Sequence, residues 1–221
     1  MIKPFFGFIL VFICTIQIAS GQVAQNTWGL GVGLASGSTV FHVPIVLERI
    51  RIEPEISFRG SSSNSAHTTT YSQDNASDAY SYSNSSQSIS LASGFYYTFP
   101  IDKIADWYIG PRVGLTFNSS TSDYNDIYSD TSFQRVTINH MKQHSMSYFA
   151  GAVFGGEYYF SSHFTVGAEL LITYSFTGQP TIENTNTVTP PYNNYNSISI
   201  PGPSSSYTIG ESTAVYIRWY F

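Results

Sequence analysis

The sequence predicts an all-β protein, an eight-stranded, antiparallel, up-and-down transmembrane β-barrel. Three observations support this fold class. Several segments alternate apolar and polar residues, no apolar run is long enough for a membrane-spanning helix, and the composition is rich in aromatic and poor in charged residues, at 16% and 10%. A membrane helix needs roughly 20 predominantly apolar residues. A closed sheet is therefore the way left to cross a bilayer, because every backbone polar group must be paired there.

The first 21 residues are predicted to be a secretory signal peptide. A lysine precedes an apolar run at residues 5–16, and the small residues Ala19-Ser20-Gly21 match a cleavage site. We therefore expect a signal peptide at 1–21 and an outer-membrane β-barrel domain at 22–221. The single cysteine, Cys14, lies in the predicted leader. The exported chain is thus expected to form no disulfide.

Eight segments have the period-two alternation of β-strands. They are residues 27–36, 39–47, 49–60, 87–99, 106–118, 145–160, 163–177 and 207–221. Short turns alternate with long polar segments between them, as in bacterial outer-membrane barrels, which have short periplasmic turns and longer extracellular loops. Segments 61–86, 119–144 and 178–206 are predicted to be extracellular loops, and both termini are expected on the periplasmic side. The tight outer turn at Gly37 and Ser38 departs from this pattern.

The direction of the apolar strand faces would distinguish a membrane β-barrel from a soluble β-sandwich. In segment 49–60, Ile50, Ile52 and Phe58 share one face and charged residues occupy the other. A membrane barrel turns the apolar face toward lipid, whereas a soluble sandwich turns it inward. Strand lengths near the roughly 9 to 11 residues of a membrane strand favour the barrel. So does the aromatic last strand, which would be an aggregation-prone edge in a soluble sheet. A secreted soluble β-sandwich adhesin remains the alternative.

Charged residues on the predicted inward faces fall into two layers when they are counted from the turns. Opposite charges share each level, and an eight-stranded barrel has an interior just wide enough for side chains. We therefore predict a paired ionic plug and no open pore. The upper layer comprises Arg112, Glu55 and Glu169, and the lower layer comprises Arg218, Glu157, Arg51 and Glu53.

Several motifs together resemble the outer-membrane β-barrel domain family, in particular its small OmpA-like barrels. They are Arg-Ile-Glu-Pro-Glu-Ile at 51–56, Tyr-Ile-Gly-Pro-Arg-Val-Gly at 108–114, Gly-Gly-Glu-Tyr-Tyr-Phe-Ser at 155–161, Val-Gly-Ala-Glu at 166–169 and Arg-Trp-Tyr-Phe at 218–221. The resemblance covers nearly all of the exported chain and identifies architecture better than function. It implies that the barrel-insertion machinery reads the last strand. The residues carrying that signal would be Val215, Ile217, Trp219 and Phe221.

No catalytic, cofactor-binding or metal-binding residue is predicted. His140 and His144 have the spacing of a helical metal pair, but they lie where a predicted loop enters a strand, with no third ligand apparent. The net charge of −5 argues against nucleic acid as a partner.

We expect a monomeric protein of the cell outer membrane, surrounded by outer-membrane lipids. Its expected role is structural or a surface interaction through the loops with an unknown ligand, and it is not expected to be an enzyme. A lipid-modifying barrel enzyme remains the alternative. The predicted charged interior speaks against it, since holding an acyl chain requires an apolar one.

Overall fold

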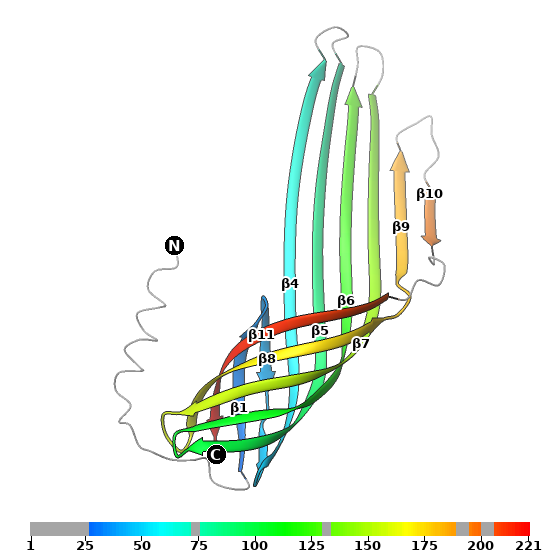
Figure 1. Ribbon diagram of the computed structural model, residues 1–221. Coiled ribbons are helices and arrows are strands. Elements are labelled where there is room, and N and C mark those ends of the chain that lie inside the picture. Colours follow the sequence, from blue (N-terminus) through cyan, green and yellow to red (C-terminus); the bar gives the residue numbers. More distant parts are fainter. Residues whose placement is uncertain (1–26, 72–75, 130–133, 189–194, 200–205) are drawn as a thin grey trace.

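The computed structural model describes residues 27–71, 76–129, 134–188, 195–199 and 206–221 (Figure 1). The predicted signal peptide lies outside these residues and stays a prediction. The regular elements of the described part are all β-strands. They are β1 (Thr27–Ala35), β2 (Ser38–His42), β3 (Ile45–Leu47), β4 (Ile50–Tyr71), β5 (Ala76–Asp102), β6 (Ala105–Ser129), β7 (Gln134–Tyr159), β8 (Phe164–Thr177), β9 (Thr181–Val188), β10 (Tyr195–Ser199) and β11 (Ser206–Tyr220).

The strands form a closed antiparallel ring, which confirms the predicted fold class. β1 pairs with β2 on one side and with β11 on the other. β2 and β3 both pair with β4, and the ring continues through β5, β6, β7, β8 and β11. β2 and β3 share one position in the wall, so the ring has the eight positions that the alternation predicts. Closure leaves no free sheet edge within the barrel.

The second predicted strand is interrupted, and the prediction of one continuous strand over 39–47 is wrong at that point. Val43 and Pro44 separate β2 from β3. Proline has no backbone N–H and cannot donate to a strand ladder. The Pro44 carbonyl still accepts a 2.8 Å hydrogen bond from the Gly29 N–H, and the Val43 N–H donates to the Pro54 carbonyl at 3.0 Å. These bonds keep the wall paired across the break.

The long polar segments are mostly strand, so their prediction as loops is wrong for most of their length. β4, β5, β6 and β7 run without interruption from the barrel into these segments, and β5 alone has 27 residues. At about 3.3 Å per residue it is roughly 90 Å long, about three times the thickness of a bilayer's hydrocarbon core. β9 pairs with the outer part of β7, and β10 pairs with β9. Figure 1 shows these six strands as a sheet raised on one side of the barrel.

The tight outer connection at Ser36 and Gly37 is a two-residue hairpin. Their φ angles are 43° and 82°. A type I′ turn requires positive φ at both central residues, and its twist matches that of the flanking strands. On this side of the barrel the wall therefore ends low, opposite the tall hairpins.

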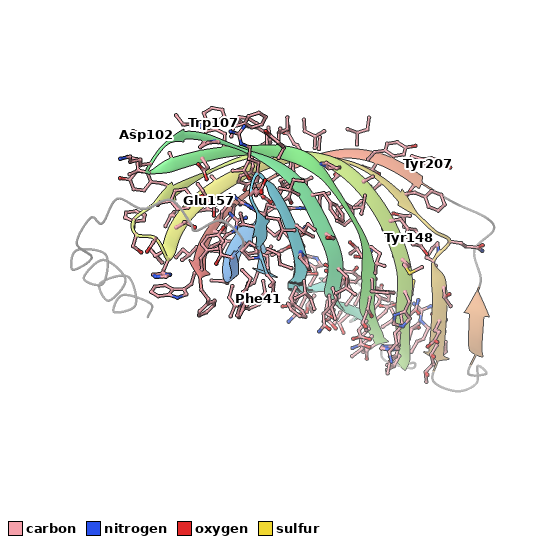
Figure 2. The ribbon with its side chains drawn as sticks, turned by 90° about the horizontal axis from the view of Figure 1, so that it is seen from below. Phe41, Asp102, Trp107, Tyr148, Glu157 and Tyr207 are labelled. Carbon is pink, nitrogen blue, oxygen red and sulfur yellow. The ribbon has the colours of Figure 1, made fainter. Side chains whose placement is uncertain are left out.

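Apolar side chains of the barrel point outward and charged ones point inward. Leu34 is 70% exposed and Ile217 is 43% exposed, whereas Arg218 is completely buried. In Figure 2, seen from below, Trp107, Phe41 and Tyr207 point away from the ring while Glu157 lies inside it. This orientation is the reverse of that in a soluble sandwich. It gives the wall an apolar outer surface suited to lipid.

Tyrosine rings fill much of the remaining interior. Tyr96, Tyr108, Tyr216 and Val153 form a buried cluster. A glycine on a neighbouring strand makes room for one of these rings, because a Cβ atom at Gly155, which pairs with Tyr108 in the ladder between β6 and β7, would collide with the Tyr108 ring.

Candidate functional site

The lower ionic layer is a closed circuit of two arginines and two glutamates. The Arg218 guanidinium, on β11, donates to both oxygens of Glu53 at 2.7 and 2.8 Å and to Glu157 Oε1 at 2.8 Å. Arg51 forms a short ion pair with Glu157 and lies 3.8 Å from Glu53 Oε2. All four side chains are at most 1% exposed. The positive and negative charges of this layer are equal in number.

Hydroxyl groups and aromatic rings complete the lower layer. Glu157 Oε1 also accepts hydrogen bonds from Thr165 at 2.9 Å and from Tyr220 at 3.1 Å. The Arg218 guanidinium lies 3.6 Å from the centre of the Tyr216 ring, a cation–π geometry. A buried charge is tolerated when it is paired and hydrogen-bonded. Every charged group of this layer is paired, but the buried Nε atoms of Arg51 and Arg218 and Nη1 of Arg51 have no hydrogen-bond partner among the described residues.

The upper layer has one arginine between two glutamates. Arg112 binds Glu169 through two parallel hydrogen bonds, from Nη1 to Oε1 at 2.6 Å and from Nη2 to Oε2 at 2.9 Å. Its Nε donates to the Tyr96 hydroxyl at 2.8 Å. Glu55 forms an ion pair with the same guanidinium, with its Oε2 at 3.2 Å from Nη1. The structure thus brings all seven predicted interior residues together, in the two predicted layers.

The sequence analysis did not single out the aromatic part of this interior. Tyr96, Tyr108, Tyr216 and Tyr220 are buried among the arginines and glutamates, and so is His42, whose Nδ1 lies 3.6 Å from Glu53. Strand alternation could have found three of them, because Tyr108 lies four residues from Arg112 and Tyr216 and Tyr220 each lie two residues from Arg218. Tyr96 and His42 lie on β5 and β2, which carry none of the seven predicted interior charges. The prediction of the interior considered charged residues only and therefore missed these rings.

A cup opens above the upper layer at the outer end of the barrel. It has a volume of about 350 Å³, and inward-facing residues of all the ring positions line it. Glu55, Arg112 and Glu169 are among its lining residues, together with the hydroxyl groups of Ser57, Ser90, Thr116 and Thr173. Beneath it, the two ionic layers occupy the lumen. The interior is therefore a cavity above a plug.

The last strand places its predicted signal residues on the lipid-facing side. Val215, Ile217, Trp219 and Phe221 are all exposed and alternate with buried interior residues. The Phe221 ring stacks on Trp28 with 4.7 Å between ring centres. The Phe221 N–H donates to the Trp28 carbonyl at 2.9 Å, and its own carbonyl accepts a short hydrogen bond from the Thr27 hydroxyl. The chain's final residue thus contributes to the seam between β1 and β11.

The raised sheet carries aromatic and polar side chains on the face that continues the barrel interior. The rings of His67 and Tyr80 lie 5.2 Å apart across β4 and β5. Tyr82 faces Tyr124 directly across β5 and β6, and both are exposed. The pKa of Asp78 is raised, first by loss of solvation and then by the nearby Asp126 carboxylate. This face offers rings and hydrogen-bonding groups side by side.

The described residues contain no group of three or more His, Cys, Asp or Glu side chains placed to hold a metal ion. His140 forms a short contact with Asp123 across β6 and β7. Within the described part of the chain, no helix has the length and apolarity to cross a membrane.

Comparison with known proteins shows the fold of this chain but not its family. No protein-family model matches the chain, and no curated protein matches its sequence. The structure is similar to a major outer membrane protein from Thermus thermophilus, with a TM-score of 0.50 and 12% identity, over 88% of this chain and 98% of that one. Weaker similarity, with a TM-score of 0.41 and 10% identity, relates it to CarO2 of Acinetobacter baumannii over 90% of this chain and all of that one. The chain therefore has the fold of the outer-membrane β-barrel proteins.

Proposed function

We propose that this protein is an integral outer-membrane barrel that displays a β-sheet at the cell surface for contact with an extracellular partner. The observation that carries the proposal is the unbroken run of β4, β5, β6 and β7 from the lipid-facing wall into the raised sheet. A strand shared by both parts transmits the rigidity of the closed barrel to the sheet above it. Binding surfaces held on a rigid scaffold lose less entropy when they bind.

Two properties of the raised sheet favour a contact role. Its interior-side face presents exposed rings such as Tyr80, Tyr82 and Tyr124 beside serine and asparagine side chains. Tyrosine combined with small polar residues is the composition of many binding surfaces, because tyrosine supplies a large contact area at low conformational cost. We propose a structural or binding role of this kind, in an OmpA-like barrel, as a monomer among outer-membrane lipids.

The ionic plug supports a role without conduction or lipid chemistry. The lower layer fills the lumen with charged side chains that are at most 1% exposed. An enzyme that held an acyl chain inside the barrel would need an apolar lumen, and this one is ionic. The proposal therefore includes no enzymatic activity.

Sidedness and export complete the proposal. The short connections at 48–49, 103–104 and 160–163 and the end of β11 would face the periplasm, and the raised sheet would face outward. Residues 1–21 would be removed as a signal peptide. The insertion machinery would then read the strand that ends at Phe221.

Cysteine labelling on intact cells tests this arrangement. Ser63 lies in the raised part of β4 and Ser162 in a short turn at the opposite end, and both are exposed. With Cys14 changed to Ser, we expect a membrane-impermeant maleimide to label S63C on intact cells and S162C only after the outer membrane is opened. Equal labelling of both variants on intact cells, or labelling of S162C but not S63C on intact cells, would overturn the sidedness.

Conduction is measured separately. The purified protein should show a heat-dependent shift in gel mobility, as folded barrels do, and should produce no discrete current steps in a planar lipid bilayer. Reproducible conductance steps would contradict the closed lumen.

A further inference from the structure

The two ionic layers differ in charge balance. Among the described interior residues, the lower layer has two arginines and two glutamates, whereas Arg112 is the one arginine of the upper layer and faces both Glu55 and Glu169. His42 also lines the cup, but its Nδ1 faces Glu53 of the lower layer. Within this layer two carboxylates therefore share one guanidinium, and the second arginine that lines the cup, Arg59, lies four residues farther along β4 than Glu55.

Of these two carboxylates, Glu55 makes fewer bonds to Arg112. Glu169 uses both oxygens on Arg112 and also accepts a hydrogen bond from the Tyr108 hydroxyl. Glu55 makes one ion pair, in which its Oε2 lies 3.2 Å from Arg112 Nη1, and it makes no hydrogen bond with a described side chain. The Glu55 side chain is only 10% exposed, and it lines the cup. A cation in the cup would therefore be stabilised by a charge-assisted hydrogen bond to the Glu55 carboxylate.

We infer that the cup at the outer end of the barrel binds a small organic ammonium ion, with Glu55 as the group that holds its charge. The volume of about 350 Å³ falls within the range of small-molecule sites. Hydroxyl groups of Ser57, Ser90 and Thr116 line the same cup and can accept the remaining N–H donors.

The cup suits an ammonium group on a carbon chain better than a bare metal ion. Calcium and magnesium need six or more oxygen ligands at short distance, and the described residues contain no cluster of three candidate metal ligands. Val40, Phe149 and Leu171 add apolar surface to the lining. This surface can pack against methylene groups, as an aliphatic amine provides.

Arg59 allows a second test, because its charge is opposite to that of Glu55. It stands on the same face of β4 as Glu55, lines the cup and is exposed, and it makes no ion pair with a described residue. Its positive charge opposes the entry of a cation. Removing the Glu55 charge and removing the Arg59 charge should therefore change binding in opposite directions.

Isothermal titration of the folded protein in a nonionic detergent tests the inference, with putrescine as the cationic probe and 1,4-butanediol as its neutral counterpart. We expect saturable binding of putrescine at pH 7.5 and low salt, and none of butanediol. Glu55→Gln should weaken binding by about tenfold or more, the effect of losing one charge-assisted hydrogen bond. Arg59→Gln should strengthen it.

Glu211→Gln is the matched control, since Glu211 lies on the outward face of β11 and is exposed. It removes the same charge from outside the cup and should leave binding unchanged. Absence of saturable putrescine binding, equal binding of butanediol, or equal effects of Glu55→Gln and Glu211→Gln would each overturn the inference. The inference does not depend on the raised sheet, so its failure leaves the proposed surface role intact.

Discussion

Glu157 is the residue on which the lower ionic layer depends most. It binds Arg51 and Arg218 at once and accepts hydrogen bonds from Thr165 and Tyr220. Two guanidinium groups in a dry interior repel each other unless a carboxylate lies between them. Glu53 alone would then have to balance both.

Glu157→Gln should therefore destabilise the barrel by about 3 to 5 kcal/mol, the cost of breaking a buried ion pair by removing one partner. The amide keeps the volume and an acceptor oxygen, so the change tests charge and not packing. Urea unfolding in lipid vesicles, followed by loss of the heat-dependent gel shift, measures the effect.

Glu183→Gln is the matched control, because Glu183 is exposed on β9, outside the barrel. It should change the free energy of unfolding by less than about 0.5 kcal/mol. Equal urea midpoints for Glu157→Gln and the unmodified protein would contradict the ionic layer.

Residue positions inside the barrel could be predicted from alternation alone. Arg112 and Glu169 lie on different strands, yet counting each from its own turn places them at one level, and in the structure they share two hydrogen bonds. The same counting could not reveal that Arg112 makes two hydrogen bonds with Glu169 and a single ion pair with Glu55. Side-chain pairing depends on rotamers and on the tilt of the strands, which a sequence does not encode position by position.

The outer hairpins are the elements that cannot be recognised from the sequence pattern. Segment 61–86 consists largely of Ser, Asn, Thr and Tyr, without the apolar alternation that marks a strand. Its pairing follows from the membrane strands, because β4 and β5 enter it already in register and each further residue adds to an existing ladder. Small cross-strand contacts such as the 2.8 Å hydrogen bond between Ser61 and Ser86 assist it. The sequence predicted the barrel strands well and the raised sheet poorly for this reason.

Excision of this hairpin should leave the barrel folded. Replacing residues 61–86 by Asn-Gly joins Gly60 to Gln87, which already face each other in the ladder, through a turn that favours tight hairpins. The ring pairs below this level are all retained. We expect an unchanged heat-dependent gel shift and a urea midpoint close to that of the full chain.

A same-length scramble of residues 61–86 serves as the comparison for effects of the sequence itself. If the excised protein failed to reach the outer membrane while the scramble did, the hairpin would be needed for assembly, and the separation of barrel from raised sheet would be wrong.

The whole molecule is held closed by the seam between its first and last strands. β1 and β11 pair over seven positions, from Gly29 with Tyr220 to Ala35 with Ala214. Phe221 adds its backbone N–H and its ring to this seam. Because a barrel without this pairing would expose two strand edges to lipid, the seam determines whether the sheet closes.

Phe221→Ala should reduce the amount of protein in the outer membrane, since it removes both the stacking on Trp28 and the last aromatic group of the proposed insertion signal. Quantitative blotting of membrane fractions from cells with equal synthesis measures this. Phe99→Ala is the control, because Phe99 is similarly exposed at the same end of the barrel but lies far from the seam. Equal losses for both variants would assign the effect to lipid contact in general.

The unequal height of the wall gives the molecule a sheltered flank and an open one. β4, β5, β6 and β7 rise far above the cup, while β1 and β2 end at the low turn of Ser36 and Gly37 (Figure 1). A large particle arriving from the tall flank is stopped by the sheet before it meets the mouth of the barrel. A solute that approaches over the low flank meets no such barrier. Access to the mouth of the barrel therefore depends on the direction of approach parallel to the membrane.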